Sequence, residues 1–306
     1  MRPAILDFDG SVTGQARTAS AIRRCGGRSV LAADLARDLR LWGAPGALDR
    51  LRARLGSDLP AGGQPDLVFA GSGDFHHVTP VLLERALAAF GGPVTVVHFD
   101  NHPDWVRFAA GSHCGSWVGA AARLPNVAKV ITVGVCSRDI GGRRAQAGDL
   151  QLIDEARLDM FAWREPEGRP EVVLHGRAWP TITAIGEAAF LDLLAQRIPT
   201  RRIYVTIDKD VLGPEDAVTN WDQGAASLAF LEAAIRCVVA GRQIIGADVV
   251  GDWSRPAYGP GPLCAVLKAG EAWLDQPRHT PAAARVGAVN EATNLRLLEA
   301  FERAAA

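Results

Sequence analysis

The sequence has little of what marks secreted, membrane-spanning or nucleic-acid-binding proteins. Its five cysteines are an odd number and none lies in a CxxC pair, which favours a reduced compartment over a disulfide framework. It has no apolar run of the length that a transmembrane helix needs, and Asp7 and Asp9 fall where a signal peptide would need its apolar core. A net charge of -1 gives no electrostatic attraction to nucleic acid or to an anionic membrane. We therefore expect a cytoplasmic protein that acts on a small molecule, with no nucleic-acid or membrane partner.

What the chain does contain is an alternation of strand-like and helix-like patterns. Its 306 residues show no internal repeat and no break in composition, so a single domain over residues 1–306 is expected. Strands are expected at residues 5–12, 66–70, 94–97, 127–135, 203–207 and 243–250, and helices within 17–55 and at 79–90, 186–198, 225–240, 263–275 and 291–306. This order predicts a three-layer α/β/α sandwich around a mostly parallel sheet. Residues 163–180 give no clear pattern.

Three potential metal ligands follow the apolar run at residues 94–97. Asp100, His102 and Asp104 occupy alternate positions, which would place them on one face of an extended chain. Two carboxylates so near one another repel, and burying them unpaired is costly. A bound cation would remove the conflict.

Two further strand ends have the same character. The run at 203–207 leads into Asp208 and Asp210, and the run at 66–70 leads through two glycines to His76 and His77. Ligands of open α/β sheets bind beyond the carboxyl ends of the strands, so we expect one shared site. Carboxylates with imidazoles and no cysteine suit Mn²⁺ or a similar divalent ion better than a thiolate zinc site, and two such ions would offset four carboxylates.

These segments resemble the motifs of the ureohydrolases, the family of arginase, agmatinase and formimidoylglutamase. The family's GGDH, DAHxD and DxD motifs correspond here to GSGDFHH at 71–77, DNHPD at 100–104 and TIDKD at 206–210, in the same order. The resemblance implies an arginase-like fold and two Mn²⁺ ions, with Ni²⁺, Fe²⁺, Co²⁺ or Zn²⁺ as alternatives. The implied ligands are one histidine of the first motif together with Asp100, His102, Asp104, Asp208 and Asp210. The extra residue Phe75 leaves both His76 and His77 as candidates, and the following Val-Thr favours His76.

The resemblance also implies an activity. GSHCGSW at 111–117 is similar to the family segment whose histidine transfers protons, so His113 is a predicted catalytic residue. Asp104 is another, and the resemblance implies that Asp104 or Asp208 bridges the ions. Two ions about 3.5–4 Å apart would share a hydroxide that attacks an sp2 carbon. The predicted function is agmatinase-like hydrolysis of a C–N bond in a guanidino or amidino compound. Relatives often form trimers or hexamers, which implies a homo-oligomer.

One departure from the family concerns the substrate. Members acting on guanidino compounds carry a glutamate in DVVE, where this chain has Gly251 after Asp248, and the nearby Asp252 and Trp253 are the candidate substitutes for substrate binding. The departure leaves two other hypotheses open, a metal-dependent amide hydrolase of deacetylase type and a non-catalytic metal-binding member of the family.

A competing resemblance lies near the N-terminus. ILDFDGSV at 5–12 resembles the DxDGT signature of haloacid dehalogenase-type phosphatases, which would make Asp7 a nucleophile and Asp9 an acid. The chain has no convincing partner motif further on, and a strand-end turn is the simpler interpretation.

Overall fold

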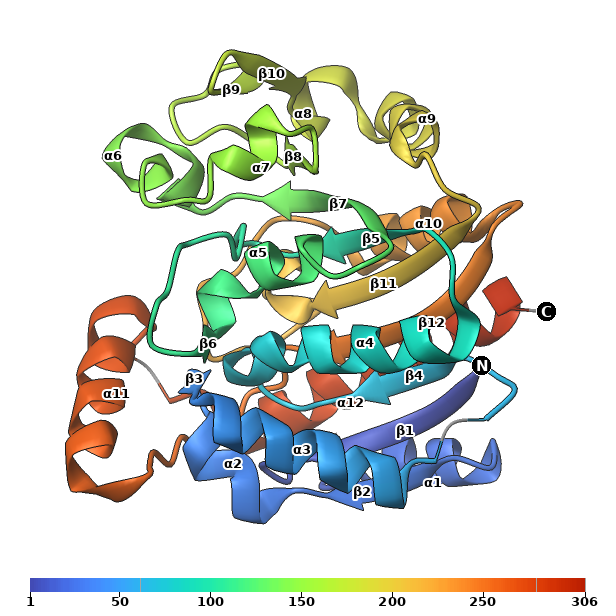
Figure 1. The fold of residues 1–306 in the computed structure, drawn as a ribbon, viewed down its shortest axis with the longest axis vertical. Helices are drawn as coiled ribbons and strands as arrows, with labels where there is room; N and C mark the ends of the chain where they lie inside the picture. The colour runs from blue at the N-terminus through green and yellow to red at the C-terminus, as the bar shows by residue number, and fades with distance from the viewer. Residues whose placement is uncertain (61, 279, 306) are drawn as a thin grey trace.

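The computed structural model describes residues 1–60, 62–278 and 280–305, and its centre is an eight-stranded parallel sheet (Figure 1). The strand order is β2-β1-β4-β12-β11-β5-β7-β8. The strands are β1 Arg2–Asp7, β2 Arg28–Leu31, β4 Asp66–Phe69, β5 Val94–Phe99, β7 Val127–Val135, β8 Leu158–Ala162, β11 Arg202–Asp208 and β12 Gln243–Val250. All pairings described in this sheet are parallel, so the carboxyl ends of its strands lie along one edge.

Helices cover both faces of the sheet, which confirms the predicted α/β/α sandwich (Figure 1). One face carries α3 Pro45–Asp58, α4 Thr79–Phe90 and α5 Trp117–Ala122, and the other carries α1 Ala16–Arg24, α10 Leu228–Val239 and α12 Ala283–Ala305. Away from these faces, α9 Glu187–Arg197 packs on α10, and α11 Gly261–Asp275 stands beyond the carboxyl ends of the strands, on the left in Figure 1. The shorter helices are α2 Ala33–Leu39, α6 Gly142–Ala145, α7 Gln151–Asp154 and α8 Ile182–Ile185. In the described part of the chain, every helix is too short or too polar to cross a membrane.

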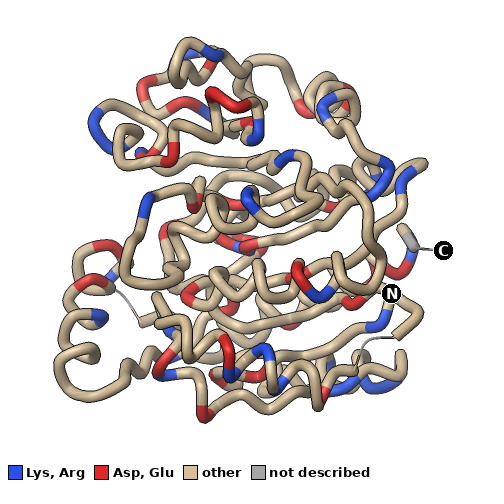
Figure 2. Tube along the Cα trace, in the orientation of Figure 1, with Lys and Arg blue, Asp and Glu red and all other residues tan. Residues whose placement is uncertain are grey.

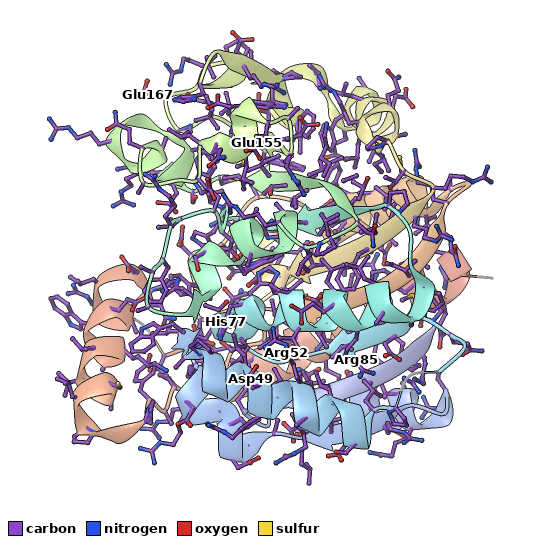
Figure 3. All side chains as sticks on the ribbon, viewed as in Figure 1. Asp49, Arg52, His77, Arg85, Glu155 and Glu167 are labelled. Carbon is purple, nitrogen blue, oxygen red and sulfur yellow. The ribbon has the colours of Figure 1, made fainter. Side chains whose placement is uncertain are left out.

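The central strands are buried on both faces because their sequences are apolar throughout. All six residues of β5 are buried, as are seven of the eight residues of β12. Side chains fill the space between the sheet and its helices (Figure 3), and charges of both signs are interspersed over the trace (Figure 2). This burial explains why the strands at 127–135 and 243–250 have the predicted bounds.

Strands without a long apolar run were not predicted. In β2 only Val30 is buried, because this strand lies at the edge of the sheet. The segment 163–180 forms a hairpin of β9 Glu171–Leu174 and β10 Arg177–Pro180, and β8 precedes it. Strands of four or five residues give weak signals in the sequence, and β9 and β10 are also only partly buried.

The expected extended geometry of the ligand segments is wrong. Strand β5 ends at Phe99, one residue before the first candidate ligand. Strand β11 ends at Asp208 and continues as a single 3-10 turn, η4 Lys209–Val211. The two acidic segments are therefore loops and turns, and tertiary packing rather than strand alternation brings their side chains together.

Candidate metal centre

A cavity of about 630 Å³ opens at the carboxyl ends of the central strands. Six of the predicted residues line it: Asp100, His102, Asp104, His113, Asp208 and Asp210. They come from three separate segments: the loop after β5, the short strand β6 Ser112–His113, and the end of β11 with the turn that follows it. The structure thus gathers the predicted acidic residues around one space.

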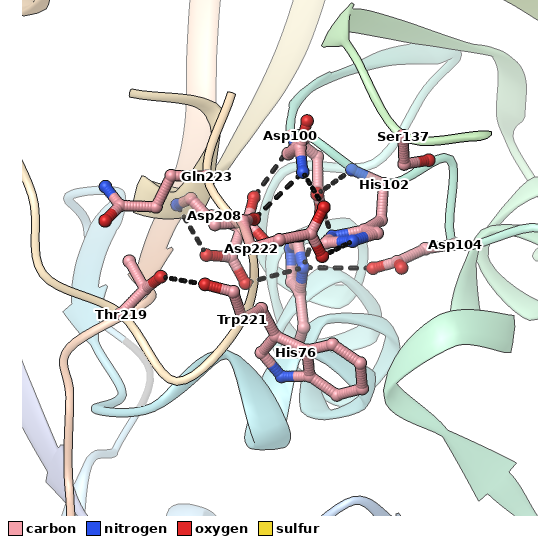
Figure 4. A network of polar contacts seen from close by, with 12 residues as sticks. His76, Asp100, His102, Asp104, Ser137, Asp208, Thr219, Trp221, Asp222 and Gln223 are labelled. Atoms are coloured by element: carbon pink, nitrogen blue, oxygen red, sulfur yellow. Dashed lines mark hydrogen bonds and ion pairs between the residues drawn. The ribbon is translucent and has the colours of Figure 1, made fainter. Parts of the chain in front are cut away.

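His76 lies at the base of this group, among the carboxylates (Figure 4). It belongs to η1 Gly73–Val78, the 3-10 turn after β4, and it is 1% exposed. Its Nδ1 atom is 3.1 Å from Asp100 Oδ2, 3.2 Å from Asp104 Oδ2 and 3.7 Å from Asp208 Oδ2. One imidazole nitrogen therefore faces three carboxylates.

The tautomer of His76 follows from its second nitrogen. Nε2 lies 2.9 Å from Thr206 Oγ1, and that hydroxyl donates its own proton to Asp248 Oδ1 at 2.8 Å. Thr206 must then accept the proton of Nε2, which leaves Nδ1 to hold a proton or a cation between the carboxylates. Nδ1 is buried, and none of the three nearby carboxylate oxygens is aligned for a hydrogen bond to it, as expected of a metal ligand.

A second set of donors adjoins the first. His102 Nδ1 is 2.9 Å from Asp210 Oδ2, and its Nε2 is 2.9 Å from Asp222 Oδ1. Two groups have ligand atoms close enough for one ion each: His76 with His98, Asp100 and Asp104, and Asp100 with His102 and Asp210. Asp100 belongs to both groups, so the geometry suits two neighbouring cations that share this carboxylate.

Asp208 completes the acidic set and is held by backbone alone. Its Oδ1 accepts a hydrogen bond from the amide of Asp210 at 2.9 Å. Burial, and then the charge of Asp210, raise the pKa of Asp208 to about 8. Burial and the same neighbour raise the pKa of Asp100 well above its ordinary value. Carboxylates that oppose one another's ionisation fit a site for divalent cations.

His98 is a site residue that the sequence did not predict. It is fully buried in β5, where its Nε2 lies 2.8 Å from Asp100 Oδ2 and its Nδ1 lies 3.1 Å from Thr132 Oγ1. The only signal in the sequence is its position two residues before Asp100, in a strand that otherwise looks like core.

His77, the alternative to His76, lies apart from the carboxylates, at the start of α4 (Figure 3). Its ring is fully buried and faces the short strand β3 Trp42–Gly43, where a Cβ on Gly43 would be 3.6 Å from its Nε2. Burial and neighbouring cationic groups hold the pKa of His77 well below its ordinary value. The structure therefore brings His76, and not His77, to the cluster.

His113 lies in the cavity wall, on β6 Ser112–His113. Its Nδ1 accepts a hydrogen bond from the amide of Gly115 at 2.8 Å, and its Nε2 contacts a carboxylate oxygen of Glu271 from α11. The histidine thus has one ring nitrogen fixed by a backbone amide and the other facing a carboxylate.

Asp104 has a hydrogen-bond donor of its own. Trp117 donates from Nε1 to Asp104 Oδ2 at 2.7 Å.

Asp252 and Trp253 do not line the cavity, so their predicted role in substrate binding does not fit the structure. Asp252 is 1% exposed, its Oδ1 is 2.8 Å from Lys209 Nζ, and it accepts a hydrogen bond from Gln15 Nε2 at 2.7 Å. The backbone turns at Gly251, which has a φ of 94°, and this turn directs Asp252 into the core.

The N-terminal acidic pair forms a turn. Asp7 accepts hydrogen bonds from Gly10 and Thr13, and Asp9 accepts from Ser11 at 2.6 Å and from Ser254 at 2.7 Å. Neither carboxylate lines the cavity. These contacts agree with the strand-end interpretation of the segment.

Comparison with known families and sequences gives two matches. The model of the Arginase family matches residues 44–260. An uncharacterized protein of Thermotoga maritima is 26% identical over 186 residues, which are 61% of this chain and 58% of that protein. The chain thus matches less than two thirds of this relative's length.

Solved structures share the fold over nearly the whole chain. The arginase from Bacillus cereus has a TM-score of 0.58 at 15% identity and covers 96% of both chains. The proclavaminate amidino hydrolase from Streptomyces clavuligerus has a TM-score of 0.54 at 17% identity, covering 95% of this chain and 91% of its own. A hypothetical agmatinase from Burkholderia thailandensis has a TM-score of 0.54 at 18% identity, covering 99% and 86%. At these identities the likeness shows the fold.

Proposed function

The chain belongs to the arginase family, and we propose that it is a metal-dependent hydrolase that cleaves a C–N bond of a guanidino- or amidino-type small molecule. Members of this family are hydrolases that act on amidino C–N bonds. The observation that carries the proposal is the convergence of His76 Nδ1, from the turn after β4, with the carboxylates of Asp100 and Asp104, from the loop after β5.

We propose two Mn²⁺ ions per chain, with Ni²⁺, Fe²⁺, Co²⁺ or Zn²⁺ as alternatives. The ligands would be His76, His102, Asp100, Asp104, Asp208 and Asp210. The four carboxylates balance the charge of two divalent ions, and an all-oxygen and imidazole donor set suits these metals. When bound, such ions supply Lewis acidity, which lowers the pKa of water and polarises the substrate.

The residues around the ligands fix their positions. Thr206 orients His76, His98 lies against Asp100, and Trp117 donates to Asp104. Such supporting hydrogen bonds hold the ligand atoms in place before a cation or a substrate arrives.

His113 would supply the proton that the departing amine needs. For this step the ring must carry a proton on both nitrogens, so that releasing the Nε2 proton leaves a neutral imidazole, and the Gly115 amide that donates to Nδ1 in this structure must then turn away. Glu271 contacts Nε2 and stabilises the ring in the orientation that presents this nitrogen to the cavity.

A second candidate is a metal-dependent amide hydrolase. It is favoured by Gly251, which presents no acid at the position where guanidino-specific relatives carry glutamate, and by the buried position of Asp252. The same metal chemistry would serve a neutral amide.

The test begins with a metal analysis of the purified protein. The Mn²⁺-loaded protein is then given guanidino, formimino and amide compounds, with urea, ammonia and free acid measured. Release of urea or ammonia from an amidino group supports the proposal, and release of an acid from an amide supports the second candidate. Silence across the panel would favour a non-catalytic metal-binding protein.

The remaining expectations are also proposals. We place the protein in the cytoplasm because its cysteines form no disulfide in the described structure and it has no candidate membrane span there. A homo-oligomer is proposed from the family alone, and light scattering of the purified protein tests it.

A further inference from the structure

The cavity is more acidic than a metal centre requires. Eight carboxylates and two arginines line it, a deficit of six positive charges, of which two divalent ions would supply four. The carboxylates outside the proposed ligand set are Asp139, Asp222, Glu271 and Asp275. The remaining negative charge favours a substrate that is itself a cation.

Among these four, Glu271 has the most buried side chain, and it has no lysine or arginine as a partner. Its oxygens accept from His113 Nε2 and from Trp42 Nε1, the latter at 3.1 Å. Neither donor is a lysine or an arginine: Trp42 offers a neutral indole, and His113 offers Nε2 because its Nδ1 accepts the amide proton of Gly115.

The other wall acids differ from Glu271. Asp222 lies 2.9 Å from Nε2 of His102, a proposed metal ligand, and its side chain is 58% exposed. Asp139 lies 3.5 Å from Arg144. Asp275 is exposed at the mouth. Of the four, Glu271 alone combines a fixed position in the cavity wall with the absence of a lysine or arginine partner and of contact with a proposed metal ligand.

The helix that carries Glu271, α11, is anchored by Lys268. Lys268, one turn earlier in α11, donates from Nζ to the carbonyls of Arg37 at 3.3 Å and Asp38 at 2.9 Å, and its ammonium lies 4.4 Å from the centre of the Trp42 ring. Trp42 in turn donates to Glu271. The carboxylate is therefore held in place before any ligand binds, as recognition groups must be.

No acid can take this role from the loop after β12. Gly251 has a φ of 94°, and a Cβ there would lie 2.4 Å from Asp208 Oδ1 and 2.5 Å from the amide nitrogen of Lys209. Asp252 is paired with Lys209 in the core. Glu271 reaches the cavity from a different element, beyond the residues that match the family.

We propose that Glu271 binds the positive charge of the substrate, an amidinium or guanidinium group, and so selects cationic over neutral compounds. This inference rests on the proposed function. A carboxylate has about four acceptor sites, and two donors occupy Glu271, so sites remain for charge-assisted hydrogen bonds from a planar cation.

The test compares methylguanidinium with methylurea, its neutral analogue of the same shape. Their binding to the Mn²⁺-loaded full-length protein is measured by calorimetry. We expect the natural protein to prefer methylguanidinium, and Glu271→Gln to reduce that preference by about tenfold to a hundredfold. Methylurea affinity, metal content and melting temperature should stay unchanged. Glu271→Asp should retain part of the preference.

The matched control is Glu299→Gln, which alters an exposed glutamate paired with Arg303 on α12. It should leave both affinities unchanged. No preference in the natural protein, or an unchanged preference in Glu271→Gln, would overturn the inference. A preference for methylguanidinium that Glu271→Gln reduces, in a protein that hydrolyses no amidino compound, would support the role of Glu271 and remove the proposed function. Hydrolysis of an amidino compound, with the same preference in Glu271→Gln as in the natural protein, would support the proposed function and remove the role of Glu271.

Discussion

Thr206 accepts a hydrogen bond from His76, with 2.9 Å between Oγ1 and Nε2. The threonine hydroxyl donates a hydrogen bond to Asp248, whose carboxylate also accepts hydrogen bonds from Thr79 at 3.0 Å and from Tyr204 at 2.7 Å. The buried carboxylate of Asp248 can only accept, so it fixes which group donates in each of the two hydrogen bonds that link it through Thr206 to His76. His76 therefore presents Nδ1 to the acidic cluster, and β12 contributes to the centre through Asp248 although none of its residues lines the cavity.

Thr206→Val should weaken metal binding without unfolding the protein. The substitution keeps the shape of the side chain and removes the acceptor that orients His76. Loss of such a supporting contact costs about tenfold to a hundredfold in metal affinity, which a competitive Mn²⁺ titration measures. Thr95→Val is the control, because Thr95 is buried in β5 but bonds to Thr200 at 2.8 Å. Equal metal affinity in both variants would contradict the role given to Thr206.

Metal should stabilise the protein more at pH 8 than at pH 6.5. Burial lowers the pKa of His76, but Asp100 and Asp104 raise it well above 6.5, and the pKa of Asp208 is raised to about 8. Both groups bind protons more tightly folded than unfolded, so the metal-free protein loses their stabilising contribution as pH rises through this window. Because cations replace these protons, the gain in melting temperature on Mn²⁺ loading should grow with pH.

Two other histidines do not disturb this comparison. Burial holds the pKa values of His77 and His98 well below 6.5, so both are neutral in the folded protein throughout the window, and their protonation in the unfolded state contributes equally to the melting temperatures with and without metal. Scanning calorimetry with and without Mn²⁺ measures the difference. A gain that stays constant or shrinks between pH 6.5 and 8 would mean that the cluster does not exchange protons for metal.

Asp208→Asn and His113→Asn should separate metal binding from proton transfer. Asp208 faces His76 at 3.7 Å and belongs to the proposed ligand set, so its amide variant should lose metal content and turnover together. His113 contacts Glu271 and no proposed ligand, so its variant should keep the metal and lose turnover by about a hundredfold to ten thousandfold. Atomic absorption beside a turnover assay distinguishes them. Full activity in both variants would remove the mechanism.

The chemistry of the centre could be predicted from the sequence because it depends on residue type at strand ends. Asp100, Asp104 and Asp208 follow apolar runs whose burial leaves few other places for their side chains. The extended geometry expected for them was wrong, since a turn at Asp104, with a φ of 47°, and the turn after Asp208 set their directions. Turns of this kind depend on packing with distant segments, which a single sequence does not specify.

Residues that reach the site from outside these motifs could not be predicted. His98 looks like any residue of a buried strand, and Glu271 like any charged residue on a helix, until the sheet order and the position of α11 are known. Asp252 shows the reverse case. Because it is next to Gly251 in the sequence, its side chain was expected to bind substrate. Lys209, forty-three positions earlier, instead holds it in the core.

Lys268→Met should loosen α11. The variant keeps most of the buried stem and loses the ammonium that bonds to two carbonyls at the end of α2 Ala33–Leu39 and stacks on Trp42. Hydrogen bonds from a buried charge are worth about 1.5–3 kcal/mol, so faster amide exchange in α11 and a lower free energy of unfolding are expected. Arg278→Gln, which removes an exposed stacking contact with Trp273, should change neither. Unchanged exchange in α11 would show that Lys268 is not its anchor.

Gly251→Ala should damage the metal centre from the backbone side. The residue has a φ of 94°, which disfavours any side chain, and its new Cβ would lie 2.4 Å from Asp208 Oδ1. A strained backbone conformation costs about 1–3 kcal/mol, and Asp208 must also move. We therefore expect both a lower free energy of unfolding in urea and a weaker affinity for Mn²⁺.

Two further glycines separate these causes. Gly241 has a φ of 70° with no atom within 4 Å of an added Cβ, so Gly241→Ala should lower stability and leave Mn²⁺ affinity unchanged. Gly73 lacks a positive φ, but its Cβ would lie 2.4 Å from Asp208 Oδ2, so Gly73→Ala should weaken Mn²⁺ binding through displacement of the carboxylate. If Gly73→Ala and Gly251→Ala both bind Mn²⁺ as the natural protein does, Asp208 is not a ligand, because neither variant can leave its carboxylate where it lies.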